Sequence, residues 1–207
     1  MRFLAFEGLD GSGKSTLIQG VRAELERQGL PFVLTREPGG TPIGDEIRQM
    51  LLRTEGDTPT PRAEALLYQA GRAHHVEKLI QPALQRGAWV ISDRFAASSL
   101  AFQAGGRAIS LSDIEWLNQF STAGLQPDLY ILLDLTVAES LRRMSGRAQE
   151  ADRFEREKSD FHERVRQAYL QLAAKDPARW LVLDAGVAPE QLLMQLLTTL
   201  RGKKWLA

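Results

Sequence analysis

Cysteine is absent from this chain of 207 residues. Disulfide bonds, thiolate metal centres, iron–sulfur clusters and cysteine nucleophiles are therefore excluded, and the chemistry must use oxygen and nitrogen groups. Long apolar runs are also missing. The apolar segments, such as residues 129–133, have the length of a strand and cannot span a bilayer, and the apolar run at the N-terminus is too short for a signal peptide. We therefore expect a cytoplasmic protein with no membrane partner.

An excess of charge is missing too, because 26 Lys and Arg residues balance 26 Asp and Glu residues. This balance argues against nucleic acid or an anionic membrane as a partner. Asparagine occurs once, at Asn118, where Gln119 follows it. The base-reading motif Asn-Lys-x-Asp of GTPase switches is therefore absent. The three histidines lack neighbours at metal-ligand spacing.

Short apolar runs alternate with amphipathic segments along the chain. Strands are predicted over residues 3–6, 32–34, 89–91, 129–133 and 180–183. Helices are predicted over 14–28, 46–53, 62–86, 112–122, 139–144, 160–174 and 189–200, where apolar residues recur at three- and four-residue spacing. Strands that alternate with helices predict an α/β fold with a five-stranded, parallel, doubly wound sheet. The length predicts a single domain, 1–207.

One segment, at about 142–158, is dense in Arg, Asp and Glu and nearly lacks apolar residues. A solvated helix face is the simplest interpretation. The alternative is a mobile lid that brings arginine to a phosphate.

The most specific local pattern is a glycine-rich loop between the first predicted strand and the first predicted helix. It fits Gly-x-x-x-x-Gly-Lys-Ser/Thr. Such a loop turns backbone N–H groups towards phosphate, Lys14 would reach the β- and γ-phosphates, and the Ser15 hydroxyl would bind Mg²⁺. A glycine-rich turn with an unrelated lysine is the structural alternative. The predicted ATP-binding residues are Gly8, Leu9, Asp10, Gly11, Ser12, Gly13, Lys14, Ser15 and Thr16.

Further polar clusters follow the second and third predicted strands, where ligands gather in a parallel sheet. These clusters are Thr35-Arg36-Glu37-Pro38-Gly39-Gly40-Thr41 and Asp93-Arg94-Phe95, followed later by Gln103-x-Gly-Gly-Arg107 and Asp152-Arg153-Phe154-Glu155. Together with the loop and the preceding Glu7, they resemble the thymidylate kinases, from the first strand to about Ala174. The resemblance implies a P-loop nucleoside monophosphate kinase-like fold. It also implies phosphorylation of dTMP to dTDP by ATP, in dTTP synthesis for DNA replication.

The same resemblance implies a binding site for dTMP. Two arginines would hold its phosphate, because the guanidinium fork suits that oxyanion, and Asp10 would bind the 3′-hydroxyl. Tyr68 and Arg72 share one helix face, where the ring would stack on thymine and the guanidinium would donate to a thymine oxygen. Core packing is the structural alternative for Tyr68, and pairing with Glu37 or another carboxylate is the alternative for the two arginines. The implied residues are Asp10, Arg36, Tyr68, Arg72, Arg94, Ser99, Phe102 and Gln103.

Phe102 departs from the family, which commonly has tyrosine there. Phenylalanine keeps the bulk that would exclude a ribose 2′-hydroxyl but loses a hydroxyl contact. The family also tends to hold the bond between Glu37 and Pro38 in the cis form, which would aim Arg36 at the pocket.

Catalysis of phosphoryl transfer requires positioning and charge neutralisation. The resemblance implies Mg²⁺ held by Ser15 and Asp93, although capping of the next turn is an alternative for Asp93. Lys14 and Arg94 are the first catalytic candidates. Because the loop contains no arginine, a lid arginine would complete the set, as in many bacterial members. The arginines considered are Arg142, Arg143, Arg147, Arg153 and Arg156.

Among these lid arginines we favour Arg147 and Arg153. Pairing of Arg153 with Asp152 or Glu155 is the structural alternative. We expect Arg153→Ala to lower turnover with little change in stability.

The predicted partners are ATP, dTMP and a second copy of the chain, because family members form dimers. Residues 111–120 carry apolar side chains that fit a dimer face, although core packing explains the same pattern. A related kinase for another base remains the nearest alternative function. A non-catalytic nucleotide-binding module that signals through its lid is an alternative of a different class.

Overall fold

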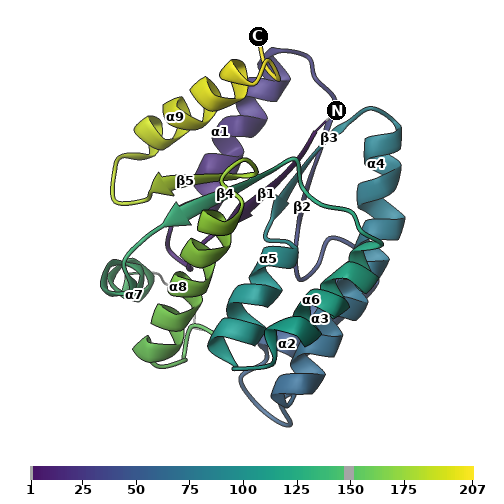
Figure 1. The fold of residues 1–207 in the computed structure, drawn as a ribbon, viewed down its shortest axis with the longest axis vertical. Coiled ribbons are helices and arrows are strands. Elements are labelled where there is room, and N and C mark those ends of the chain that lie inside the picture. The colour runs from purple at the N-terminus through teal and green to yellow at the C-terminus, as the bar shows by residue number, and fades with distance from the viewer. Residues whose placement is uncertain (1, 147–151) are drawn as a thin grey trace.

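The computed structural model describes residues 2–146 and 152–207 as a parallel sheet between two layers of helices (Figure 1). The strands are β1 (Phe3–Glu7), β2 (Phe32–Arg36), β3 (Trp89–Asp93), β4 (Leu129–Asp134) and β5 (Trp180–Asp184). They form a sheet in the order β2-β3-β1-β4-β5, and every pairing is parallel. The predicted five-stranded parallel sheet is therefore confirmed.

The helices follow the strands in the alternation that the sequence predicts. The α-helices are α1 (Lys14–Arg27), α2 (Pro42–Leu52), α3 (Pro61–His75), α4 (Gln81–Gln85), α5 (Ala96–Ser99), α6 (Leu111–Thr122), α7 (Val137–Ser145), α8 (Ser159–Lys175) and α9 (Pro189–Gly202). The π-helices are η1 (Val76–Ile80) and η2 (Leu100–Gly106). Helices α3, η1 and α4 run without a break, so together they form the long helix predicted over 62–86.

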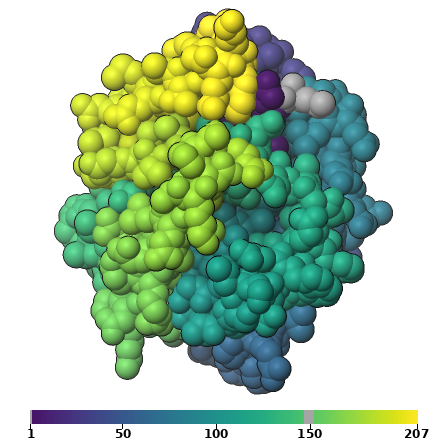
Figure 2. All heavy atoms as spheres, viewed as in Figure 1, coloured from purple at the N-terminus to yellow at the C-terminus, as the bar shows by residue number. Residues whose placement is uncertain are grey.

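Both faces of the sheet are buried, and side chains alternate between them. Leu4 and Phe6 pack towards α1 and α9, whereas Phe3 and Ala5 pack towards η1, α4 and α5. Figure 1 shows α1 and α9 together on one side of the strands, and Figure 2 shows the yellow atoms of α9 at one end of that view. This double burial explains why the strands are nearly continuous apolar runs.

Two helical segments differ from the sequence prediction. Helix α2 begins at Pro42 rather than at residue 46, because the Thr41 side chain accepts a hydrogen bond from the Gly44 amide at 3.0 Å and caps the helix. Helices α5 and η2 were not predicted. The wide π turn places apolar residues off the 3.6-residue period, so the usual pattern is lost there.

The carboxyl edge of the sheet carries the polar clusters. Strand β1 lies between β3 and β4, so the loop after Glu7 opens at the middle of this edge. The peptide bond between Glu37 and Pro38 is cis, as the resemblance implies. No helix in the described part of the chain is long and apolar enough to cross a membrane.

Candidate active site

The phosphate loop joins β1 to α1 and depends on glycine at positions where the backbone is left-handed. Gly8, Gly11 and Gly13 have φ angles of 134°, 78° and 94°, a region that side chains disfavour. A Cβ atom at Gly8 would also lie 2.5 Å from the Leu133 carbonyl oxygen. The loop therefore passes against β4 in a form that only glycine permits.

Lys14 is folded into this loop. Its Nζ donates to the Gly8 and Leu9 carbonyl oxygens at 3.2 and 3.1 Å and lies 3.7 Å from Asp10. Burial lowers the pKa of Lys14 below its ordinary value, and the Arg94 charge lowers it further, while Asp10 acts in the opposite direction. Lysine at the start of a helix, surrounded by inward-facing backbone, is suited to binding phosphate oxygens.

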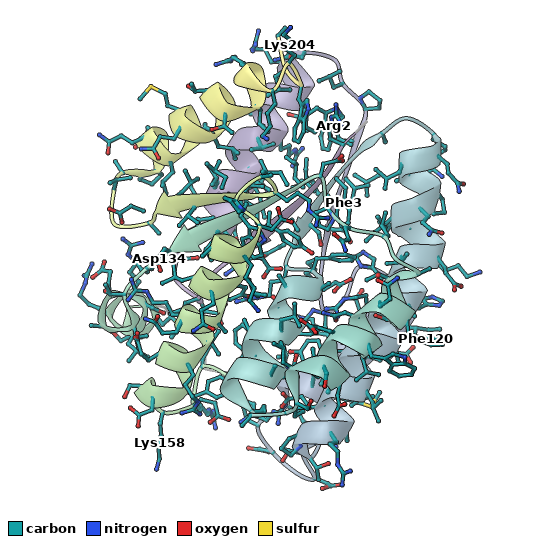
Figure 3. The ribbon with its side chains drawn as sticks, viewed as in Figure 1. Arg2, Phe3, Phe120, Asp134, Lys158 and Lys204 are labelled. Carbon is teal, nitrogen blue, oxygen red and sulfur yellow. The ribbon has the colours of Figure 1, made fainter. Side chains whose placement is uncertain are left out.

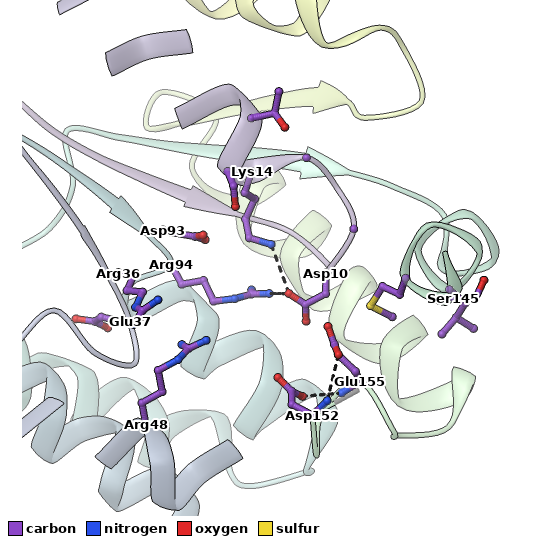
Figure 4. Close-up of a pocket in the computed structure, with 16 residues that line it drawn as sticks. Asp10, Lys14, Arg36, Glu37, Arg48, Asp93, Arg94, Ser145, Asp152 and Glu155 are labelled. Carbon is purple, nitrogen blue, oxygen red and sulfur yellow. Dashed lines mark hydrogen bonds and ion pairs between the residues drawn. The ribbon is translucent and has the colours of Figure 1, made fainter. Parts of the chain in front are cut away.

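Arg94 extends from the end of β3 towards the same loop (Figure 4). Its Nη2 donates to Asp10 at 2.8 Å, and its Nη1 donates to the Gly8 carbonyl at 3.0 Å. Burial opposes the charge, but Asp10 and the hydroxyl group of Tyr169 outweigh it, so the pKa of Arg94 is well above its ordinary value. Asp10 thus lies between two cations, one from the loop and one from β3.

A cavity of about 740 Å³ opens over these groups. It brings together most of the predicted ATP-binding residues and both predicted phosphate-binding arginines. Figure 4 shows Lys14 and Arg94 both reaching the Asp10 carboxylate, with Arg36 lying beyond Arg94. The predicted residues that line it are Asp10, Gly11, Gly13, Lys14, Ser15, Thr16, Arg36, Asp93 and Arg94.

The oxygens of Ser15 and Asp93 fit a hard divalent cation. Both residues line this cavity and an adjoining one. Asp93 Oδ1 is buried and has no hydrogen-bond partner among the residues that the structure describes, which is an unusual state for a buried oxygen. Hydroxyl and carboxylate oxygens are ligands that Mg²⁺ accepts. No group of three or more His, Asp or Glu side chains that could hold a metal by itself occurs in the described ranges.

Two further arginines contribute positive charge to the large cavity. Arg36 is exposed and lies 3.6 Å from Asp45, so it pairs with a carboxylate other than Glu37. Arg48 of α2 donates to the Pro38 carbonyl at 3.1 Å and lines both the large cavity and a third, adjoining cavity. Burial and then the Arg36 charge lower the pKa of Arg48.

The third cavity is continuous with the first, since both are lined by Asp10, Glu37, Arg48, Arg94 and Asp152. Its other walls include the aromatic rings of Tyr68, Phe102 and Phe154. Tyr68 and Phe102 each contact Phe154 edge to face, with ring centroids 6.2 and 5.9 Å apart. Gln103 also lines it and donates from Nε2 to Glu64 Oε1 at 2.9 Å. Aromatic walls with a few polar groups suit a flat base.

Arg72 lies at the floor of this third cavity, only 1 % exposed. Its Nε donates to Glu37 at 2.8 Å, and its Nη1 donates to Ser99 at 3.0 Å. Ser99 is therefore engaged by Arg72 and is not among the residues that line the cavity, whereas the neighbouring Ser98 is. Of the other predicted dTMP-binding residues, Arg36 lines the large cavity and the rest line this third cavity.

The two favoured lid arginines have different positions. Arg147 lies outside the described residues. Arg153 is held against the segment between α2 and α3: its Nε donates to the Leu51 carbonyl at 3.1 Å and its Nη2 to Glu64 at 2.5 Å. Its alternative pairing partners were expected to be Asp152 and Glu155, but Glu64 takes that place.

Helix α7, in which the predicted lid segment begins, contacts the phosphate loop. Ser140 Oγ donates to the Asp10 carbonyl at 2.6 Å, and Arg143 Nη1 donates to the Gly11 carbonyl at 3.3 Å. Arg142 instead pairs with Glu139 on the surface. The lid arginines of α7 are thus engaged by protein acceptors.

Several residues of the site were missed by sequence reasoning. The sequence pattern places Glu7 directly before the phosphate loop and predicts no role for it, although a charged residue at the end of an apolar strand is a usable signal. Arg48, Glu64 and Tyr169 lie on amphipathic helices, where charged or aromatic residues at such positions are ordinary. No sequence pattern separates them from their neighbours.

Known proteins resemble this chain over nearly its whole length. The family model described as thymidylate kinase matches residues 6–195. The thymidylate kinase of Bdellovibrio bacteriovorus is 55 % identical over 99 % of this chain and 97 % of its own length. That of Clavibacter sepedonicus is 51 % identical over 89 % of this chain and 87 % of its own length. That of Neisseria gonorrhoeae is 46 % identical over 89 % of each.

Proposed function

The chain belongs to the thymidylate kinase family, and we propose that its two connected cavities bind the two substrates of that family's reaction. The chain phosphorylates dTMP to dTDP with the γ-phosphoryl group of ATP, a step in dTTP synthesis. The observation that carries the assignment is the meeting of the cavities at Asp10 and Arg94. One cavity is rich in phosphate-binding groups, and the other has aromatic walls.

On the donor side, the loop from Gly8 to Thr16 binds the ATP phosphates. Lys14 is already oriented by two loop carbonyls, so little reorganisation is needed when it meets phosphate oxygens. Preorganised charge of this kind is a principal source of catalysis in phosphoryl transfer.

Mg²⁺ is proposed at Ser15 and Asp93. The buried Oδ1 of Asp93, which lacks a hydrogen-bond partner in the described structure, supports this assignment. When bound, the ion neutralises charge on the donor phosphates. Asp93 and Arg94 are adjacent in the chain. The proposed metal ligand and the proposed ligand of the dTMP phosphate therefore lie together at the carboxyl end of β3.

On the acceptor side, Arg36 and Arg94 hold the dTMP phosphate, and we add Arg48, which sequence analysis did not single out. All three line the large cavity. Asp10 meets the sugar hydroxyl of the acceptor. Arg94 can act in the transfer itself because it already lies beside the loop that holds the donor.

The base of dTMP is placed in the aromatic cavity. Tyr68 provides a stacking face, and burial raises the pKa of its hydroxyl, which keeps the ring neutral. Arg72 and Gln103 supply polar contacts to the base edge, and Phe102 crowds the position of a 2′-hydroxyl. Ser99 contributes by holding Arg72.

The transferred phosphoryl group also requires charge from the lid. Arg147 remains our prediction for this role and lies outside the described residues. Arg153 remains a prediction as well. Its contacts with Glu64 and the Leu51 carbonyl support an additional role in holding the end of the lid.

Association of two copies is proposed through α6 and its neighbours α3 and α2, which pack side by side. On α6, Trp116 and Phe120 are 65 % and 74 % exposed and stack on each other with ring centroids 5.8 Å apart. Phe120 points away from the body of the molecule in Figure 3. Exposed aromatic side chains of this size are typical of interfaces. We also place the reaction in the cytoplasm, where ATP and nucleoside monophosphates are found.

The test is ADP release from ATP and Mg²⁺ with a panel of acceptors. The panel contains the monophosphates of thymidine, deoxyuridine, uridine, adenosine and guanosine. We expect release to be fastest with thymidine monophosphate. Faster release with a different acceptor would support kinase activity but contradict the assignment of the base pocket. ATP binding without acceptor-dependent ADP release would favour a non-catalytic nucleotide-binding module.

A further inference from the structure

A fully buried carboxylate lies beneath the phosphate loop. Glu7, at the end of β1, is 0 % exposed. It accepts hydrogen bonds from the Phe95 amide at 2.9 Å, from Ser98 Oγ at 2.6 Å and from the Tyr169 hydroxyl at 2.7 Å. Burial raises its pKa, and Arg94 acts against that shift. Burying a carboxylate in this way is costly unless each oxygen is satisfied, and here both are.

The backbone of Arg94, which directly precedes Phe95, is held by two further hydrogen bonds. Arg94 has a φ angle of 71°, in the left-handed region that a residue with a side chain disfavours. Its amide donates to the Phe6 carbonyl at 2.9 Å, and its carbonyl accepts from Ser92 Oγ at 2.6 Å. The next amide, that of Phe95, donates to Glu7. The turn that carries Arg94 is therefore held from both sides.

The Arg94 side chain is linked to the same carboxylate through one hydroxyl group. Arg94 Nη1 donates to the Tyr169 hydroxyl at 3.3 Å, and that hydroxyl lies 2.7 Å from Glu7 Oε2. A hydroxyl has one proton and two lone pairs. Because guanidinium can only donate, the Tyr169 oxygen accepts from Arg94 and its proton goes to Glu7.

We propose that Glu7 is a positioning residue for phosphoryl transfer, which fixes the backbone of Arg94 through the Phe95 amide and its guanidinium through Tyr169. This inference rests on the proposed contact of Arg94 with the acceptor phosphate. It assigns a function to two residues that do not line either cavity.

The arrangement joins three parts of the chain that are far apart in sequence. Glu7 precedes the phosphate loop, Arg94 follows β3, and Tyr169 belongs to α8, the helix that follows the lid. The Tyr169 ring is buried and packs against Phe102, with centroids 6.3 Å apart. One buried set of hydrogen bonds thus connects the strand before the phosphate loop, Arg94 and helix α8.

The test removes one oxygen and leaves the packing intact. In Tyr169→Phe, Arg94 and Glu7 lose their shared hydroxyl while the ring remains. We expect kcat/KM for dTMP to fall about 10- to 100-fold, the size of one hydrogen bond to a charged group. KM for ATP should change less than about twofold, because no ATP contact is altered.

Tyr130→Phe is the matched control. Tyr130 is packed against Trp180, with ring centroids 4.6 Å apart, and within the described structure its hydroxyl makes no hydrogen bond to Glu7 or Arg94. Glu7→Gln is the second variant and should show the same selective loss for dTMP. Thermal melting of every variant separates folding from positioning.

The decisive measurement is Tyr169→Phe in an Arg94→Ala background. If Tyr169 acts through Arg94, the hydroxyl deletion causes no further loss there. The same loss in both backgrounds, or a lower melting temperature with unchanged kinetics, would overturn the positioning role. If Arg94→Ala is impaired but Tyr169→Phe is not, only this inference fails. If Arg94→Ala turns over normally, the proposed contact of Arg94 fails and the inference fails with it.

Discussion

Arg72 is a charged side chain in the interior, and its surroundings explain how the chain tolerates it. Every nitrogen of the guanidinium donates to at least one protein acceptor, so its charge is shared over several elements. Glu37 is the acceptor with a full negative charge, at 2.8 Å. The guanidinium is therefore fixed by the protein alone. Its acceptors are Glu37, Gln69, Ser99, Asn118 and the Phe95 carbonyl.

Asp93 permits the sharpest prediction about a single atom. Asp93→Asn keeps the shape of the side chain and removes its charge. We expect the Mg²⁺ concentration for half-maximal activity to rise about 10- to 100-fold, the range typical of altered metal surroundings. The measurement is a Mg²⁺ titration of ADP release at saturating ATP and dTMP.

The control for that titration is Asp134→Asn. Asp134 is also an aspartate at the carboxyl end of a strand, but it pairs with Arg166 at 2.7 Å and does not line either cavity. It should leave the Mg²⁺ requirement unchanged. An equal shift in both variants would contradict a metal-binding role for Asp93.

Helix η2 was not predicted from the sequence, although it packs closely against α8. A Cβ atom at Gly106 would lie 2.4 Å from the Phe161 ring, and one at Gly105 would lie 2.8 Å from Ala168 Cβ. These glycines permit α8 to lie close against η2. Sequence reasoning used them only as part of a motif, because their partners lie more than fifty positions away.

Arg153 fastens the segment that precedes α8 to the α2–α3 segment. Sequence analysis predicts that Arg153→Ala lowers turnover with little change in stability. Its observed bonds to Glu64 and to two backbone carbonyls lead us to expect a loss of stability as well. We expect about 1–3 kcal/mol, measured as a lower melting temperature, together with reduced kcat.

The comparison variant for stability is Arg142→Ala. Arg142 belongs to α7, is largely exposed and pairs with Glu139, so its removal should change the melting temperature little. Reduced turnover in Arg153→Ala at an unchanged melting temperature would contradict the fastening role and support a purely catalytic one.

Sequence and structure agree where the determinants are local. The phosphate loop and the five strands were predictable because each is set by residues adjacent in the chain. Part of the site was predictable because the family resemblance assigns roles to whole motifs rather than to single residues. What escaped prediction depends on distant partners: Arg153 and Glu64 are separated by 89 positions, and Tyr169 and Glu7 by 162. No local pattern carries such pairings.

At the scale of the whole molecule, the exposed aromatic pair Trp116 and Phe120 on α6 marks the surface through which we propose that two copies associate. Phe120→Arg places a charge there, and we expect the molecular mass in solution to fall from twice the chain mass of 23.1 kDa to that mass. Burying an unpaired charge in an interface is strongly unfavourable. Light scattering after size-exclusion chromatography measures the mass directly.

Met194→Arg is the control for the mass measurement. Met194 is 62 % exposed on α9, away from α2, α3 and α6. It should leave the mass unchanged. A wild-type protein that already has the mass of one chain would contradict the proposed association.

The stacked pair on α6 also has an optical consequence. The chain contains four tryptophans, of which Trp89 is buried in the core and Trp180 and Trp205 are partly buried, while Trp116 is largely exposed. An indole in water emits at longer wavelength and is quenched by iodide more readily than a buried one. If two copies associate through Trp116, their separation on dilution should shift the intrinsic fluorescence to longer wavelength. Tryptophan fluorescence therefore reports association without an added label.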